Sequence, residues 1–288
     1  MKSAELTSIF KERLSAHYDP AEIRSFIFIL LEHHNGWNKV DVLRNFGEEL
    51  EPSVILAMMA SLEQLEAGKP VQYITGTTWF NGLKIGVDHN VLIPRPETEE
   101  LCSLIGQELT NFGYSQPFRI FDIGTGSGCI AIDLKRSFPM SEVHAVDISK
   151  PALKLAERNA KANGCVIAFT HMDILDQKRW SELPSFDLIV SNPPYIPASD
   201  RNTMDRNVVE FEPESALFVP DSNSLKFYKA IIDLCRDHLN TGGRLYFEIY
   251  EHAGSKLMDY FHGKFSGKVE LLNDFKGKER FIRAQKTG

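Results

Sequence analysis

The sequence has few cysteines, and its histidines form no metal-binding motif. The four cysteines include no pair with the CxxC spacing of a zinc site or a redox centre. The nine histidines form neither an HxH nor an HExxH pattern. We therefore expect no metal site, and we expect reduced thiols that pack as small apolar side chains.

Long apolar runs and an excess of basic residues are also lacking. No stretch approaches the roughly 20 apolar residues that a membrane-spanning helix requires, and the first residues lack the apolar core of a signal peptide. The net charge is −7 at pH 7, which disfavours sequence-independent binding of nucleic acid. We expect a cytoplasmic protein that contacts neither a membrane nor nucleic acid directly.

The N-terminal part of the chain has a helical pattern. Residues 1–76 carry apolar residues at intervals of three and four, which predicts a small all-α bundle of four or five helices. Residues 77–93 contain Asn81-Gly82 between apolar residues, a hairpin signal, and we expect a β-hairpin linker there. A further helix is predicted over residues 97–113.

From Phe118 onward, strands and helices alternate. Helices are predicted over 128–138, 151–164 and 224–240. This alternation is typical of a parallel, doubly wound sheet. We therefore expect residues 94–288 to form an α/β domain around a seven-stranded, mostly parallel sheet, with two strands at the end of the chain and no helix between them. The strand-like segments are FRIFDIG, EVHAVDIS, CVIAFTHMD, FDLIVSN, GRLYFEIY, KVELLND and RFIRAQK.

A glycine-rich loop, DIGTGSG, follows the first of these strands at residues 122–128. Its glycines permit a tight turn and close approach of the backbone to a ligand. The carboxylate of Asp122 would repel a pyrophosphate but attract a cation. The next strand ends at Asp147, where a carboxylate can bind both ribose hydroxyls. The third ends at Asp173, where the amino group of adenine can be bound.

These features describe a site for a nucleoside that carries an ammonium or sulfonium group in place of phosphates. S-adenosylmethionine fits, with its amino group near Asp122 and its ribose on Asp147. Two alternatives stay open: the glycines serve only a tight turn between strand and helix, or the loop binds a dinucleotide.

The segment SNPPYIP, residues 191–197, follows the fourth strand. Its prolines stiffen the loop, because proline fixes its own φ and restricts the preceding residue. We expect the side-chain oxygen of Asn192 and a proline carbonyl to offer two acceptors to a planar NH₂ group beside a methyl donor. Tyr195 can cover that group with its ring. The alternative is a rigid turn without a chemical role.

The motifs DIGTGSG, AVDIS and SNPPYIP resemble those of class I (Rossmann-like) methyltransferases that modify planar nitrogen. Three further segments narrow the resemblance: PVQYITG (70–76), VLIPRPETEEL (91–101) and FEPESALF (211–218). With them the chain resembles the HemK/PrmC family, the protein-(glutamine-N5) methyltransferases of class I peptide-chain release factors.

The resemblance implies methyl transfer from S-adenosylmethionine, with S-adenosylhomocysteine as product, to the glutamine of the GGQ loop of class I release factors. That glutamine would lie at a catalytic motif formed by Asn192, Pro193, Pro194 and Tyr195. The family often has an aromatic residue where Ile174 stands, which leaves the stacking on adenine open. The residues that would hold the cofactor are Asp122, Gly124, Thr125, Gly126, Ser127, Gly128, Asp147, Ile148, Asp173, Ile174 and Asn192.

The resemblance also implies that residues 1–76 recognise the release factor and that the enzyme acts as a monomer. Arg95 has either a salt-bridging or a substrate-binding role. Three competing functions stay open: a glutamine methyltransferase of a ribosomal protein, an N6-adenine or N2-guanine methyltransferase of nucleic acid, and a non-catalytic adaptor. The net charge of −7 counts against the second, because a nucleic-acid enzyme must hold phosphates.

Overall fold

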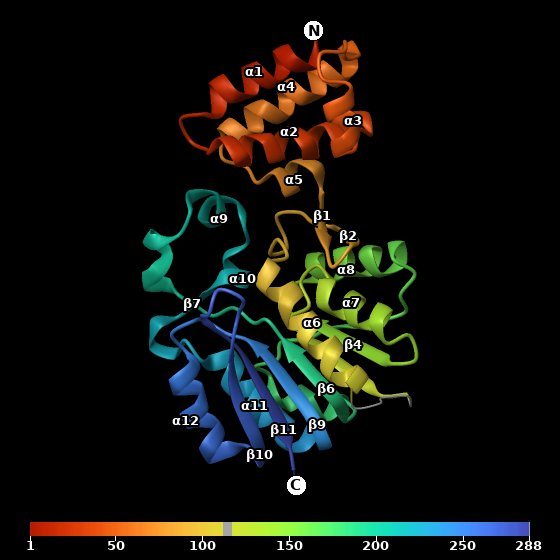
Figure 1. Cartoon of the computed structure of the whole chain (residues 1–288). Helices are drawn as coiled ribbons and strands as arrows, with labels where there is room; N and C mark the ends of the chain where they lie inside the picture. The colour runs from red at the N-terminus through yellow and green to blue at the C-terminus, as the bar shows by residue number, and fades with distance from the viewer. Residues whose placement is uncertain (112–116, 288) are drawn as a thin grey trace. The chain divides into compact units, whose positions relative to one another are not determined.

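The computed structural model describes residues 1–111 and 117–287, which form two compact units (Figure 1). The first unit comprises Met1–Thr77 together with Asp205–Phe211, and the second comprises the remaining described residues. The chain therefore passes from one unit to the other three times. Within the described residues, no helix is both long and apolar enough to cross a membrane.

The first unit is a helical bundle with its own apolar core. The side chains of Phe10, Leu30, Met58 and Leu62 are fully buried in that core. The second helix begins at Pro20, where the carboxylate of Asp19 accepts hydrogen bonds from two backbone N–H groups of the first turn. The helices of the bundle are α1 (Ser3–Leu14), α2 (Pro20–Asn35), α3 (Lys39–Arg44), α4 (Pro52–Glu66) and α5 (Val71–Thr75).

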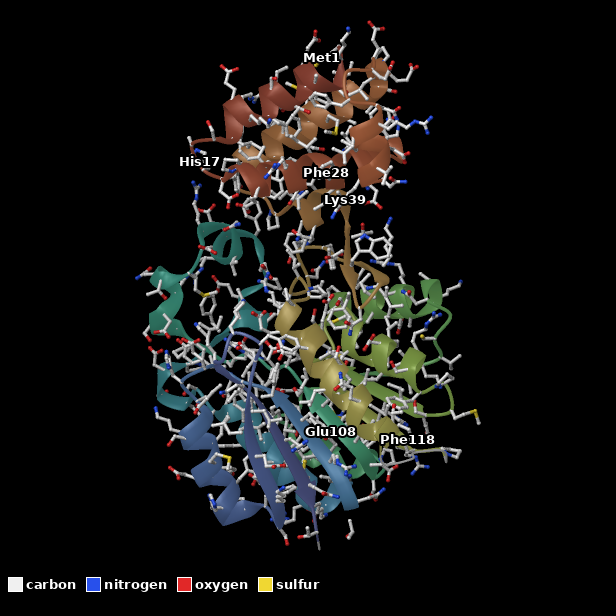
Figure 2. The ribbon with its side chains drawn as sticks, viewed as in Figure 1. Met1, His17, Phe28, Lys39, Glu108 and Phe118 are labelled. Atoms are coloured by element: carbon white, nitrogen blue, oxygen red, sulfur yellow. The ribbon has the colours of Figure 1, made fainter. Side chains whose placement is uncertain are left out.

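A hairpin and a long helix begin the second unit. Strands β1 (Thr77–Phe80) and β2 (Leu83–Gly86) are joined by Asn81 and Gly82, which have φ values of 45° and 75°, as this turn requires. Helix α6 (Pro96–Asn111) follows. The last two residues of the predicted helix, 112 and 113, lie outside the described residues. Glu108 lies near the end of α6 (Figure 2). It accepts a hydrogen bond from the hydroxyl of Tyr246 on the sheet.

The second unit is built on a seven-stranded sheet with the order β10-β11-β9-β6-β3-β4-β5. The five strands from β9 to β5 run parallel, and β11 is antiparallel to both of its neighbours. The predicted seven-stranded, mostly parallel sheet is confirmed. Its strands are β3 (Arg119–Ile123), β4 (Glu142–Asp147), β5 (Ala168–His171), β6 (Phe186–Ser191), β9 (Leu239–Glu248), β10 (Gly267–Asn273) and β11 (Glu279–Lys286).

Helices cover the sheet in two groups. Helix α7 (Cys129–Ser137) contacts both α6 and α8 (Lys150–Ala162), whereas α11 (Lys226–His238) contacts α12 (Gly254–Lys264). The central strand β6 is almost entirely buried between these layers, as expected for a parallel strand that is covered on both faces.

Several elements differ from the prediction. The edge strand β5 is shorter than the predicted strand over 165–173, because it pairs only with β4 over four residues. Helix α12 was not predicted. Neither was the small sheet of β7 (Ile196–Pro197) and β8 (Phe218–Val219). The short helices between β5 and α11 were also missed: η1 (Gln177–Glu182), η2 (Ala198–Thr203), α9 (Arg206–Phe211), α10 (Glu214–Leu217) and η3 (Asp221–Asn223).

Candidate active site

A cavity of about 370 Å³ lies at the carboxyl ends of the parallel strands in the second unit. The last residues of β3, β4 and β6 (Ile123, Asp147 and Ser191) all line it. The hydroxyl of Ser191 donates a hydrogen bond of 2.6 Å to the carbonyl of Ile123. This bond holds the start of the SNPPY segment beside the glycine loop, where ligands bind in folds of this kind.

The glycine loop forms one wall of the cavity. Gly124 and Gly126 line it with φ values of 74° and 54°, and, apart from their chain neighbours, no described residue has an atom within 4 Å of the position that a Cβ would take on either one. Gly128 has a different place: a Cβ there would lie 3.1 Å from the Cβ of Ala156 on α8. The predicted loop residues Thr125 and Ser127 line the cavity, whereas Gly128 allows α7 and α8 to pack closely.

Asp147 joins the glycine loop to the end of β4. Its Oδ2 accepts a hydrogen bond of 2.9 Å from the N–H of Gly126, and its Oδ1 accepts one of 2.8 Å from the N–H of Ser149. Burial raises the pKa of this carboxyl, and the backbone N–H groups partly oppose that shift. The carboxylate is thus held in one orientation at the cavity wall, with further lone pairs left for a ligand.

Asp122 lies fully buried beneath the loop. Its Oδ2 accepts a hydrogen bond of 2.6 Å from the hydroxyl of Thr125. Its Oδ1 finds no hydrogen-bond partner among the described residues. Burial raises the pKa of Asp122 to about 7, against the opposing effect of Thr125. Ile123 and Thr125 line the cavity and Asp122 does not, so its charge acts from behind the wall.

Apolar residues and one acid form the other end of the cavity. Ile148, Asp173 and Ile174, which the sequence predicts to hold the cofactor, line it, and Ile148 is 58% exposed. Phe227 of α11 also lines the cavity. The sequence analysis missed Phe227, because an aromatic residue in an amphipathic helix has the same pattern whether it faces a core or a ligand.

The NPPY residues divide between the cavity and the core. Asn192, Pro193 and Pro194 line the cavity. Tyr195 does not: its hydroxyl donates a hydrogen bond of 3.2 Å to Oε1 of Glu248, and its ring lies 6.1 Å from that of Tyr250. Burial, followed by the charge of Glu248, raises the pKa of Tyr195. The structure therefore places Tyr195 behind the NPPY loop, where it supports that loop.

Two residues that the sequence analysis did not single out connect to Asn192. The side-chain N–H of Asn192 donates to Oγ1 of Thr98 at 3.1 Å, and the Thr98 hydroxyl donates to Oε2 of Glu248 at 2.6 Å. Thr98 is at the start of α6, and Glu248 is the last residue of β9. No local pattern relates them, because they are separated by 150 residues.

Comparison with known proteins agrees with this geometry. The family models of the PrmC N-terminal domain and of the methyltransferase small domain match residues 5–76 and 107–211. A release factor glutamine methyltransferase from Flavobacterium psychrophilum is 39% identical over 274 residues, which cover 95% of this chain and 95% of that protein. The chain belongs to the release factor glutamine methyltransferase family. The resemblance seen in the motifs is thereby confirmed.

Other members of the family match over a similar length. The release factor glutamine methyltransferase of Bacteroides thetaiotaomicron is 34% identical over 281 residues, or 98% of this chain and 99% of that protein. The enzyme of that name from Lactococcus lactis is 39% identical over 85% of this chain and 88% of that protein. The match therefore includes both the helical unit and the α/β unit.

Solved structures share the fold at lower identity. A 16S rRNA N2 methyltransferase from T. thermophilus has a TM-score of 0.52 at 17% identity, covering 73% of this chain and 49% of that one. The catalytic domain of hMettl16 has a TM-score of 0.54 at 16% identity, covering 81% of each chain. These similarities concern the class I methyltransferase fold and carry no information on the substrate.

The family motif FEPES supplies a buried partner for Arg95. Oε1 of Glu212 lies 2.6 Å from the guanidinium of Arg95, and its Oε2 accepts a hydrogen bond of 3.1 Å from the N–H of Ile93. Both segments line the cavity, through Val91, Leu92 and Pro94 in one and through Ser215, Ala216 and Phe218 in the other. Of the two roles considered for Arg95, the structure shows the salt bridge, which ties the two segments together.

Proposed function

We propose that this protein transfers the methyl group of S-adenosylmethionine to the side-chain amide nitrogen of the glutamine in the GGQ motif of class I peptide-chain release factors. One observation carries the proposal. The glycine loop, Asp147 and Asn192-Pro193 line a single cavity, in a chain that is 39% identical over 95% of its length to a release factor glutamine methyltransferase.

The cavity residues fit S-adenosylmethionine. The carboxylate of Asp147 has lone pairs left for the ribose hydroxyls, and Asp173 provides an acceptor for the adenine amino group. Ile148, Ile174 and Phe227 form apolar walls for the adenine ring, with Phe227 supplying the aromatic surface that Ile174 lacks.

The other end of the cofactor has a cationic amino group and a sulfonium. The Oδ1 of Asp122, which has no hydrogen-bond partner among the described residues, offers an acceptor behind Thr125, and the ionised form of Asp122 adds the negative charge that a cationic ligand favours. When bound, the cofactor supplies an electrophilic methyl group at the NPPY end of the cavity. No group of three or more metal-binding side chains occurs among the described residues.

The chemistry at Asn192 and Pro193 is the activation of a weak nucleophile. An amide nitrogen reacts poorly because its lone pair is delocalised. The Oδ1 of Asn192 and the carbonyl of Pro193 accept both N–H bonds of the glutamine, which raises the electron density on nitrogen and orients it for attack. Positioning of this kind contributes up to roughly 7–11 kcal/mol in favourable cases. No strong base is needed, because nitrogen becomes acidic as it is alkylated.

The remaining assignments follow from the substrate. We assign release-factor recognition to residues 1–76, the linker to 77–93 and catalysis to 94–288. The enzyme acts as a monomer in the cytoplasm, where release factors function, without direct contact to nucleic acid. The net charge of −7 supports the last of these assignments.

Transfer of labelled methyl from S-adenosylmethionine to a purified release factor tests the function. A release factor whose GGQ glutamine is replaced by alanine serves as the control. Label on the first protein and none on the second is expected. Equal labelling of both would contradict the glutamine assignment. If neither form of the release factor is labelled but a ribosomal protein or RNA is, one of the competing functions is favoured instead.

A further inference from the structure

The side chain of Asn192 has two chemically different ends, and the end that faces the substrate decides what it can bind. Its Oδ1 accepts hydrogen bonds, whereas its Nδ2 only donates them. The glutamine amide nitrogen presents two N–H donors. An Asn192 turned by 180° about its last torsion would place N–H groups against N–H groups. The proposed function therefore requires something in the protein to fix this orientation.

Two hydrogen bonds, from Asn192 to Thr98 and from Thr98 to Glu248, fix the orientation of the Asn192 amide, because the number of hydrogens on each group decides which atom can donate. When Glu248 is ionised it has no proton to donate, so in the 2.6 Å contact between Thr98 and Glu248 the hydroxyl is then the donor. A hydroxyl has one hydrogen, and that of Thr98 is already donated to Glu248. Oγ1 of Thr98 can then only accept from Asn192, across 3.1 Å. The Asn192 atom that faces Thr98 must therefore be Nδ2.

We propose that Thr98 and Glu248 are positioning residues that fix the amide orientation of Asn192, leaving Oδ1 to accept from the substrate. The inference rests on the proposed function and adds two residues to it. Neither residue needs to touch the substrate for this effect, since both act through Asn192.

The burial of the pair supports this role. Glu248 is 1% exposed and Thr98 is 3% exposed, so water cannot readily replace the bonds between them. Two neutral hydroxyls, those of Thr98 and Tyr195, donate to the carboxylate of Glu248. A buried carboxylate without a direct cationic partner costs folding free energy. A role in orienting Asn192 would explain why the protein buries the carboxylate of Glu248 at this position despite that cost.

Substitutions at Thr98 test the proposal. Thr98→Val keeps the shape but removes the hydroxyl, and Thr98→Ser keeps the hydroxyl but removes the methyl group. Methyl transfer to the release factor is measured for both, with the dissociation constant for S-adenosylmethionine measured by calorimetry. We expect kcat of Thr98→Val to fall roughly 10- to 100-fold, as for misplacement of a reacting group. We expect Thr98→Ser to recover most of that loss, with little change in cofactor affinity for either.

Two controls separate the possible failures. Thr110→Val removes a hydroxyl that donates to the carbonyl of Gly106 within α6, and should leave kcat unchanged. If the unsubstituted enzyme labels no release factor, the proposed function fails. If it does label the release factor and Thr98→Val retains full kcat, or Thr98→Ser loses as much as Thr98→Val, the positioning role fails.

A second measurement needs no catalysis. In the cofactor-free enzyme, the Nδ2 protons of Asn192 are observable by NMR after ¹⁵N labelling. The proton bonded to Thr98 is expected to exchange slowly with solvent and to lose this protection in Thr98→Val, while Thr98→Ser retains it. Equal exchange in the unsubstituted protein and in Thr98→Val would overturn the proposal. If Thr98→Val fails to fold, Glu248→Leu gives a second comparison, because it removes the acceptor that keeps the Thr98 hydroxyl a donor. The protection should then decrease, and retention of full protection would overturn the proposal.

Discussion

Asp122 is a carboxyl group whose ionisation opposes folding. Burial raises its pKa to about 7 from an ordinary value of 3.8. Between these values the folded protein holds a proton that the unfolded chain has released, so the free energy of unfolding falls as the pH rises through this range. The fold accepts this cost at the wall of the proposed cofactor site, where a negative charge suits a cationic ligand.

The free energy of unfolding of Asp122→Asn should lack this fall with pH, so the variant should gain stability relative to the unsubstituted protein as the pH rises. Between pH 5 and pH 8 we expect a relative gain of roughly 2–3 kcal/mol in the free energy of unfolding. Denaturant unfolding at the two pH values measures this gain. We also expect weaker binding of S-adenosylmethionine. The same pH dependence in both proteins would show that the carboxyl is not the source.

Asp147→Ala should weaken the binding of S-adenosylmethionine by roughly 1–3 kcal/mol, because a charged acceptor for the ribose is lost. The N–H groups of Gly126 and Ser149 also lose their acceptor, so the loop is less well fixed. Calorimetry measures the dissociation constant. An unaltered constant would rule out the ribose assignment. Asp187→Ala, which changes a carboxylate on β6 outside the set of cavity-lining residues, is the matched control.

Protonation of Glu248 is predicted to lower kcat at acidic pH. Burial raises the pKa of this carboxyl, the hydroxyls of Thr98 and Tyr195 and the charge of Arg280 oppose the shift, and the charge of Glu97 adds to it. As the pH falls through the raised pKa, Glu248 becomes a donor to Thr98, and the Thr98 hydroxyl becomes free to donate to Asn192. We expect kcat to fall at that point and to be constant above it. A pH–rate profile measured under single-turnover conditions checks this, and a rate that increases on acidification would contradict it.

At the scale of elements, the salt bridge between Arg95 and Glu212 joins two segments of the cavity wall. In Glu212→Ala, the guanidinium of Arg95 and the N–H of Ile93 lose their acceptor. We expect a loss of roughly 1–3 kcal/mol in the free energy of unfolding, measured with denaturant. Glu214→Ala is the matched control, because its partner Arg201 and its own side chain are both exposed, and exposed ion pairs contribute little. Equal losses in the two variants would contradict the structural role of Glu212.

The elements that follow strong periodicity could be predicted from sequence. The strands that end at Ile123, Asp147 and Ser191 were predicted because buried parallel strands are continuous apolar runs. Helix α12 was missed because it has no side-chain cap and contains Gly263, both of which weaken the local signal. The short elements between Ile196 and Asn223 lack periodicity altogether.

The residues that support the site could not be predicted in the same way. Arg95, Thr98 and Glu212 lie in segments that the sequence analysis singled out, but their pairing with one another or with Glu248 exists only in the folded chain. The motifs identified several of the residues that line the cavity, such as Asp147 and Asn192. The groups that orient them depend on tertiary structure, which no spacing rule in the sequence describes.

At the scale of the whole molecule, the helical unit is not contiguous in sequence. Residues Asp205–Phe211, which include α9, group with Met1–Thr77, and the ring of Phe211 lies 3.7 Å from the position that a Cβ would take on Gly68. A fragment of residues 1–77 should therefore form its helices but be less stable than the same helices in the full chain. Hydrogen exchange of peptides from α1 to α5, compared between fragment and full chain, measures the difference. Equal protection would mean that α9 contributes nothing to the unit.

The interrupted helical unit also affects how members of the family can be recombined. A gene fusion that takes residues 1–77 from one enzyme and the rest from another would place a foreign bundle against the original α9. The crossover that keeps the unit intact exchanges residues 205–211 as well. That second exchange lies between the NPPY loop and Glu212, so replacing the unit proposed to recognise the release factor would require editing the chain on both sides of the proposed catalytic motif.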